Sequence, residues 1–195
     1  MTRDITSLLA AAADLYANDG NRAAGEAAER LRSQSAAGSN VALGPARLLP
    51  DLAAAVSAMP PGPLRHALED VGPFLSWSGG DYERPGGLAD RYAFVEVVGP
   101  DGVLPAEALR FGFYLQAPET HYPSHSHAAE EFYLPVSGTA LWQKDSGPFD
   151  AVAPGRIIHH VPFQRHAMQT RDEPMLAMWI WTGDLGFASY TFHLG

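Results

Sequence analysis

The stretch of residues 121–138 carries four side chains that can bind a metal ion: His121, His125, His127 and Glu131. In a β-strand alternate side chains share a face, so His125 and His127 are expected to point the same way. A tight turn at the small residues Ala128 and Ala129 would bring Glu131 alongside them. A further imidazole, His166, lies far along the chain. Three imidazoles and a carboxylate are the donors of an open catalytic site for a divalent transition metal ion.

The overall composition limits both the metal chemistry and the partners. The chain has 195 residues, no cysteine and a formal net charge of −9. Without thiolates, a metal ion must bind to histidine, glutamate or tyrosine. A negative net charge disfavours nucleic acids and anionic membranes, because both are polyanions. Residues 1–14 are a poor signal peptide and no apolar run reaches about 20 residues, so we expect a cytoplasmic protein without a membrane span.

The first third of the chain, residues 1–72, is rich in alanine and is predicted to be a helical N-terminal region. Apolar residues recur at helical spacing over three segments: 6–18, 23–34 and 64–71. Another helix is expected over residues 45–59, which begin with a proline and are followed by Pro60-Pro61-Gly62. Pro50 falls inside that segment and can divide it.

From residue 73 onward the pattern changes to short strands separated by turns. The expected strands, rich in aromatic and β-branched residues, cover 91–98, 109–116, 131–136, 139–143, 156–160, 175–181 and 190–194. Many short strands with turns between them are typical of a sandwich or a barrel. The sequence therefore predicts a mainly β protein in which residues 73–195 form a barrel that carries the metal site.

The spacing of the candidate ligands resembles the two motifs of the cupin superfamily, the first of which reads HxH(x)3-4E(x)6G. The matching residues are His125, His127, Glu131 and Gly138 in the first motif, and Gly155, Pro162 and His166 in the second. Two expected glycines are absent: Glu119 stands six residues before the first ligand, and Gln164-Arg165 precede the last. The resemblance covers about residues 90–195 and implies a cupin jelly-roll β-barrel, here with an N-terminal α-helical extension.

A closer resemblance rests on the pattern Tyr-x-x-His-x-His-x-x-x-Glu-x-Tyr, which runs from Tyr122 to Tyr133 behind the helical third. It looks like the cupin-type dimethylsulfoniopropionate (DMSP) lyases, in particular the DddQ type, which split DMSP into dimethyl sulfide and acrylate. The resemblance implies that Tyr133 is the catalytic base and that Tyr122 is a second tyrosine of the site. The ligands that it implies for one divalent metal ion are His125, His127, Glu131 and His166.

The physical chemistry of this β-elimination is compatible with these residues. A proton leaves the carbon next to the carboxylate, and a neutral sulfide leaves the following carbon. Coordination of the carboxylate to a dication stabilises the charge that develops. A phenol with its ordinary pKa of about 10 is a poor base at neutral pH, but a nearby metal ion favours its anion. Tyr133 shares strand parity with Glu131, so we expect it on the metal-facing side.

The implied substrate is a small zwitterion whose methylated sulfonium is a permanent cation, and aromatic faces bind such groups. Trp179 and Trp181 share one face of a late strand and are expected to bind it, together with Tyr122. His121 is expected at the rim or behind the ligands. Further aromatic candidates are Phe94, Phe111, Phe113, Trp142 and Tyr190. The pair His159-His160 is expected to be structural.

Two alternatives remain open from the sequence. An Fe(II)-dependent cupin dioxygenase would use the same ligands to activate O2. A non-enzymatic small-molecule-binding cupin would use the barrel as a sensor, although no basic segment or helix-turn-helix accompanies it here. The donor set suits Zn, Fe, Mn, Co or Ni equally. A homodimer is compatible with the sequence but is not specified by it.

Overall fold

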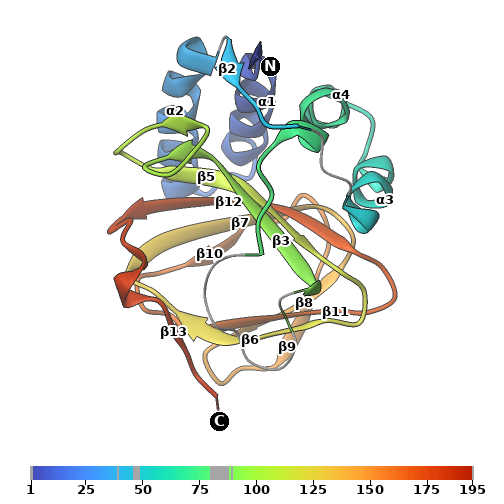
Figure 1. Cartoon of the computed structure of the whole chain (residues 1–195). Helices are drawn as coiled ribbons and strands as arrows, with labels where there is room; N and C mark the ends of the chain where they lie inside the picture. The colour runs from blue at the N-terminus through green and yellow to red at the C-terminus, as the bar shows by residue number, and fades with distance from the viewer. Residues whose placement is uncertain (1, 39, 46–48, 80–87, 89, 195) are drawn as a thin grey trace.

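The fold is a barrel of two β-sheets with helices packed against one of them (Figure 1). The computed structural model describes residues 2–38, 40–45, 49–79, 88 and 90–194. Its helices are α1 (Thr6–Ala17), α2 (Arg22–Gln34), α3 (Pro50–Ala58) and α4 (Pro63–Val71), with 3-10 turns η1 (Ser35–Gly38), η2 (Gly72–Phe74) and η4 (Phe187–Ser189). The short strands β1 (Thr2–Arg3) and β2 (Val41–Ala42) pair beside α1 and α2.

The predicted helices over 6–18, 23–34 and 64–71 are confirmed to within one residue at each end. The prediction over 45–59 is wrong at its start, because α3 begins at Pro50. A proline ring has no N–H and clashes with the carbonyl four residues earlier, so the helix can begin at Pro50 but cannot continue through it. Leu49 before it is extended, and residues 46–48 lie outside the described residues.

The strands of the described residues form two larger sheets, which confirms the prediction of a mainly β barrel with N-terminal helices. The six-stranded sheet has the order β10-β7-β12-β5-β3-β4, and the five-stranded sheet has the order β13-β6-β11-β8-β9. Their bounds are β3 (Tyr92–Gly99), β4 (Leu104–Pro105), β5 (Arg110–Gln116), β6 (His121–Ser126), β7 (Ala129–Ser137), β8 (Ala140–Lys144), β9 (Phe149–Val152), β10 (Ile158–His160), β11 (His166–Thr170), β12 (Met175–Gly183) and β13 (Thr191–Phe192). Strands β4, β6, β9 and β11 were not among the predicted strand segments, although His125 and His127 were expected on a strand.

The link between β6 and β7 differs from the expected tight turn. These two strands lie in opposite sheets, so the chain crosses the barrel at His127 and Ala128 instead of folding back on itself. Strand β6 also passes through Pro123 without a break. The register against β11 shifts there, since His166 faces His125 while Met168 faces Tyr122. The extra residue forms a bulge, which accommodates a proline because it needs no ladder N–H.

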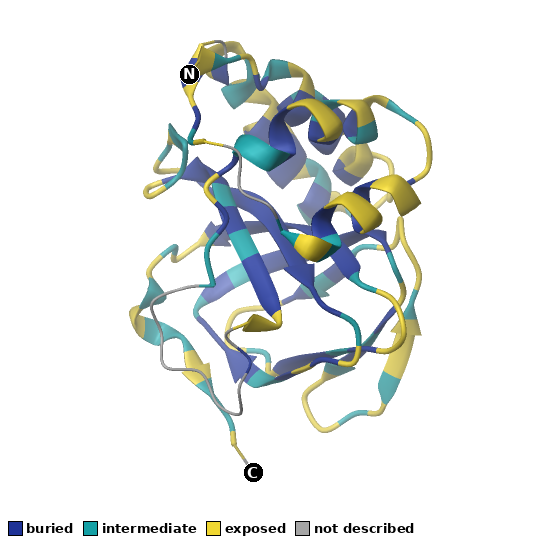
Figure 2. Cartoon of the chain, turned by 45° about the vertical axis from the view of Figure 1, so that its right-hand side comes forward, coloured by how far each residue is buried: buried dark blue, intermediate teal, exposed yellow. Residues whose placement is uncertain are grey.

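Most residues of the long strands in the six-stranded sheet are buried (Figure 2), and alternate residues contribute to two different cores. One face packs under the helices through Phe111, Phe113, Phe132, Leu134, Met178 and Ile180. The other face fills the barrel through Tyr114, Tyr133, Trp179 and Trp181. Because both faces of the sheet contact an apolar core, its strands are nearly continuous apolar runs in the sequence.

Helix α1 covers the outer face of this sheet with Leu8, Leu9 and Tyr16, all fully buried. The Tyr16 hydroxyl donates a hydrogen bond of 3.0 Å to the carbonyl of Phe132 on β7. The expected boundary at residues 72–73 falls within η2, and a division into two domains there stays a prediction. None of the helices in the described part of the chain combines the length and apolar character needed to cross a membrane.

Candidate metal centre and its aromatic cavity

The four candidate ligands meet inside the barrel from three places in the chain. His125 is on β6 and pairs in register with His166 on β11, while His127 follows β6 directly. Glu131 comes from β7 in the opposite sheet. All four side chains are buried, with exposed fractions of 1–2 %. One ligand atom from each histidine lies within 4.8 Å of the other two. The Oε2 of Glu131 is 3.1 Å from Nε2 of both His127 and His166.

Backbone carbonyls fix the orientation of the three imidazoles. Nδ1 of His125 lies 2.9 Å from the carbonyl of Pro123, Nδ1 of His127 lies 3.1 Å from that of Ala129, and Nδ1 of His166 lies 2.9 Å from that of Gln164. A carbonyl can only accept, so each Nδ1 carries the proton. In the neutral rings, Nε2 then has a free lone pair. Such second contacts hold metal-binding histidines in one tautomer and orientation.

The donor set fits a divalent metal ion. The Nε2 lone pairs of His127 and His166 each lie 3.1 Å from the same carboxylate oxygen of Glu131 inside the barrel, so a proton or a cation must separate them. Nε2 of His166 is buried and lies close to Glu131, but it is not in a geometry for a hydrogen bond. Unsatisfied buried acceptors are costly, and a bound cation would satisfy them together. Nitrogen and oxygen donors of this kind do not select one transition metal.

The charges of the cluster also favour binding of a cation. Burial opposes ionisation of Glu131, but the neighbouring His127 and then His166 hold the pKa of its carboxyl well below the usual value. Burial, followed by the charge of His166, lowers the pKa of His125 well below its ordinary value. An ionised carboxylate and a neutral imidazole are the forms that bind metal ions.

Trp181 on β12 orients the carboxylate. Its indole N–H donates a hydrogen bond of 2.7 Å to Oε1 of Glu131, which leaves Oε2 directed at the histidines. The indole ring also lies 4.2 Å from the ring of His127. Trp181 therefore contacts two candidate ligands as well as the cavity beside them.

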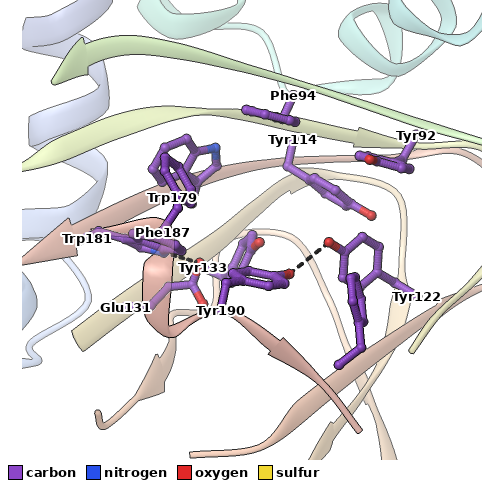
Figure 3. A pocket seen from close by; sticks show the side chains of 11 residues that line it. Tyr92, Phe94, Tyr114, Tyr122, Glu131, Tyr133, Trp179, Trp181, Phe187 and Tyr190 are labelled. Carbon is purple, nitrogen blue, oxygen red and sulfur yellow. Dashed lines mark hydrogen bonds between the residues drawn. The ribbon is translucent and has the colours of Figure 1, made fainter. Parts of the chain in front are cut away.

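An aromatic cavity of about 60 Å³ adjoins Glu131 (Figure 3). Its lining residues are Tyr92, Phe94, Tyr114, Tyr122, Glu131, Tyr133, Trp179, Trp181, Phe187, Tyr190 and Phe192. The hydroxyl groups of Tyr122 and Tyr190 are hydrogen-bonded to each other at 2.8 Å. The ring of Tyr190 stacks against both His125 and His127. Residues 187–192, near the end of the chain, therefore form one wall of the cavity.

Tyr133 lies on the cavity side of β7, as its shared parity with Glu131 predicts. In the register of the sheet it faces Trp179, two residues from the pair formed by Glu131 and Trp181. Burial, followed by the charge of Glu131, raises the pKa of Tyr133 well above the ordinary value. A phenolate at this position therefore requires positive charge nearby.

The structure separates the other expected site residues. Trp179 and Trp181 line the cavity, as do Tyr122, Phe94 and Tyr190. In contrast, Phe111 and Phe113 face the helices, and Trp142 is buried in the barrel beside the ring of Tyr133.

His121 is not among the residues that line the cavity, and its expected role at the rim or behind the ligands stays a prediction. It is exposed and lies beside Phe149. The bulge at Pro123 changes the parity of β6, so that Tyr122 and His125 both face inward and His121 faces outward.

Four lining residues were not expected from the sequence: Tyr92, Tyr114, Phe187 and Phe192. Strand parity could have indicated the two tyrosines, because Tyr92 and Tyr114 alternate with apolar residues that face the helices. Phe187 and Phe192 lie in a short turn and a two-residue strand, where periodicity carries no signal.

Comparisons with known proteins identify one family. The family profile described as dimethylsulfoniopropionate lyase matches residues 43–177. The chain is 39% identical over 122 residues to the putative DMSP lyase DddL of Cereibacter sphaeroides and 31% identical over 96 residues to the DMSP lyase DddQ of Ruegeria pomeroyi. These matches cover 62% and 49% of this chain and 51% and 48% of the relatives. The chain thus spans about half the length of the curated relatives that it matches.

Solved structures confirm the cupin fold. A structure described as DMSP lyases RdDddP and RnDddQII superposes with a TM-score of 0.72 and 26% identity, covering 97% of both chains. DddQ from Ruegeria pomeroyi DSS-3 superposes with a TM-score of 0.62 and 24% identity over 77% of this chain and 82% of that one. A cupin-2 domain from Rhodospirillum rubrum, 12% identical, gives a TM-score of 0.50 over 63% of this chain and 77% of the other.

Proposed function

The chain belongs to the dimethylsulfoniopropionate lyase family, and we propose that it cleaves DMSP into dimethyl sulfide and acrylate by a base-initiated β-elimination. The observation that carries the proposal is a single cavity in which Tyr133 and a wall of aromatic rings adjoin the carboxylate of the buried His3Glu cluster. A zwitterionic sulfonium substrate requires both the aromatic wall, for its cationic end, and the cluster, for its carboxylate end.

The cation of the substrate fits the aromatic part of the cavity. Among the described lining residues, Glu131 carries the only ionisable carboxylate, and no lysine or arginine is present. Trp181 already binds Oε1 of that carboxylate, and His127 and His166 face its Oε2. The methylated sulfonium therefore binds against the faces of Trp179, Tyr92 and the neighbouring aromatic rings, because these faces attract a permanent cation.

The carboxylate of the substrate belongs at the cluster. A divalent ion held by His125, His127, Glu131 and His166 would bind that carboxylate and stabilise the charge that develops beside it. The hydroxyl pair of Tyr122 and Tyr190 lies on the same side of the cavity and can donate to a carboxylate oxygen. Together these groups orient the carbon chain of the substrate across Tyr133.

Tyr133 is the proposed base. Its phenolate oxygen takes the proton from the carbon next to the carboxylate, the electron pair of that C–H bond forms the double bond of acrylate, and the C–S bond breaks. The sulfur leaves with the electron pair of the C–S bond as neutral dimethyl sulfide, so the leaving group needs no acid. The proton on Tyr133 then returns to solvent. Positive charge at the cluster must offset burial and the charge of Glu131, because both favour the neutral phenol.

Headspace gas chromatography after mixing the metal-loaded protein with DMSP tests the proposal. Equal release of dimethyl sulfide under air and under nitrogen is expected, since elimination uses no oxygen. Release only under air would favour the dioxygenase alternative, which the family match does not favour. No release under either gas would refute the lyase proposal. The homodimer and the cytoplasmic location expected from the sequence stay predictions.

The variant Tyr133→Phe tests the identity of the base. We expect it to release dimethyl sulfide at least about 100-fold more slowly, the usual effect of losing a positioned base, while its metal content stays that of the unaltered protein. Tyr16→Phe is the matched control, because Tyr16 is an equally buried tyrosine on the helix side of the sheet. A Tyr133→Phe protein that keeps most of its activity would assign the base to another residue.

A further inference from the structure

The neighbours His159 and His160 on β10 lie on opposite sides of the sheet. In the register with β7, His160 pairs with Glu131 and His159 pairs with Phe132. His159 is partly exposed, stacks on Phe132 and contacts Glu130 at 2.8 Å. His160 is fully buried and faces the interior of the barrel. The two histidines therefore have different surroundings, although they are adjacent in the sequence.

The ring of His160 lies flat against the ring of His166. The ring centroids are 3.9 Å apart and the planes differ by 13°. This is the closest parallel contact that either ring makes among the ring contacts of the described residues. Because the ring of His160 covers one face of the His166 ring, His166 cannot rotate about its Cβ–Cγ bond without a steric clash.

Two hydrogen bonds hold His160 itself in one orientation. The indole N–H of Trp142 lies 2.9 Å from Nε2 of His160, and because that N–H can only donate, Nε2 must be the unprotonated nitrogen. Nδ1 then carries the proton and faces Oε1 of Gln164 at 3.4 Å, a long contact. His160 is therefore a neutral ring with a fixed tautomer.

Gln164 provides a second link between His160 and His166, in addition to the stacking of their rings. Its side-chain amide donates to Oδ2 of Asp145 at 3.0 Å, and its backbone carbonyl accepts the Nδ1 proton of His166 at 2.9 Å. Gln164 thus contacts His160 with its side chain and fixes the tautomer of His166 with its backbone carbonyl. Both routes from His160 end on the same candidate ligand.

We propose that His160 is a positioning residue that, with Trp142 and Gln164, holds His166 with its Nε2 directed at the metal cluster. The proposal rests on the proposed function, since it takes His166 as a ligand. The rings of His125 and His127 stack on Tyr190, whereas the ring of His166 stacks on His160. His166 is the ligand that depends on His160.

Metal binding measured without substrate tests the proposal. We would load the full-length protein with Co(II), record its visible absorption spectrum, and measure the Co(II) dissociation constant by competition with a chelator. His160→Ala removes the stacked ring, whereas Trp142→Phe leaves His160 in place and replaces the indole with a smaller ring that has no N–H. Both variants are expected to bind Co(II) about 10- to 100-fold more weakly, as is usual when a contact that orients a ligand is lost, and to show an altered spectrum.

The neighbouring substitution His159→Phe is the matched control and should leave both the dissociation constant and the spectrum unchanged. If His160 only supported the fold, His160→Ala and Trp142→Phe would lower the melting temperature while the Co(II) spectrum and affinity stayed those of the unaltered protein, and that result would overturn the proposal. An unaltered protein that binds no Co(II) would also overturn it. Binding of Co(II) without release of dimethyl sulfide would instead count against the proposed function alone.

Discussion

Glu119 holds a backbone conformation that the cupin pattern assigns to glycine. Its φ is 51°, in the left-handed region, within the turn between β5 and β6. For a residue with a side chain, that conformation destabilises the folded state by about 1–2 kcal/mol. A glycine avoids this strain, but it lowers the free energy of unfolding by about 0.4–1 kcal/mol because it increases the entropy of the unfolded chain. We therefore expect Glu119→Gly to raise the free energy of unfolding by about 0.5–1 kcal/mol, measured by urea denaturation.

Glu107→Gly is the control for this prediction. Glu107 is also exposed and lies in a loop, but its φ is not positive. Glycine there gains no relief of strain and should lower the free energy of unfolding by a few tenths of a kcal/mol or more. Equal effects of the two substitutions would show that the turn at Glu119 is not strained.

Most of the candidate site could be predicted from the sequence. The spacing of His125, His127 and Glu131 and the remote His166 selected four side chains that the structure brings together. The bulge at Pro123 could not be predicted, because a change of parity depends on how β6 pairs with β11. That bulge is the reason why Tyr122 reaches the cavity and His121 does not.

Helix α1 is joined to the six-stranded sheet by the buried hydrogen bond from the Tyr16 hydroxyl to the carbonyl of Phe132. Burial, followed by the charge of Glu131, raises the pKa of Tyr16 well above the ordinary value. The hydroxyl should therefore stabilise the fold at neutral pH by about 1 kcal/mol and destabilise it in strong alkali. Above about pH 10 the unfolded tyrosine loses its proton and the folded one keeps it, so stability falls as the pH rises.

The variant Tyr16→Phe is expected to reverse its effect with pH. At pH 7 its free energy of unfolding should be lower than that of the unaltered protein by about 1 kcal/mol. Each pH unit above about 10 removes up to about 1.4 kcal/mol from the unaltered protein and nothing from the variant at this position, so the two should become equal near pH 11. A constant difference between pH 7 and pH 11 in denaturant unfolding would contradict this account.

Strand β11 was not predicted from the sequence because it buries polar residues among its apolar ones. Strand β11 buries His166 and Thr170 as well as Ala167 and Met168, so its pattern of apolar residues is not that of a strand. Thr170 is satisfied inside the protein by a 2.6 Å hydrogen bond to the carbonyl of Ala117. Polar residues buried for such reasons conceal the periodicity on which strand prediction rests. Strands β5, β7 and β12 also bury polar residues, such as Gln116 and Glu131, but each is longer and carries enough apolar residues for the strand to be predicted.

The candidate metal centre lies between the two large β-sheets of the barrel. His125 and His166 belong to the five-stranded sheet, and Glu131 belongs to the six-stranded sheet. A bound ion would therefore connect the sheets at a point where the buried acceptors otherwise repel one another. The apolar cores on the two faces of the six-stranded sheet do not include this cluster, so the fold should survive without the ion.

Removal of the metal ion should lower the melting temperature without unfolding the protein at room temperature. An ion present at about 100 times its dissociation constant stabilises the folded state by about 2.7 kcal/mol, which corresponds to roughly 5–10 °C for a chain of this size. We expect that shift when a chelator is added to the metal-loaded protein, measured by circular dichroism. His166→Ala should show a much smaller shift, because it lacks one ligand of the cluster. If the chelator lowers both melting temperatures equally, the ion that it removes is bound elsewhere, and if it lowers neither, the cluster between the sheets holds no ion.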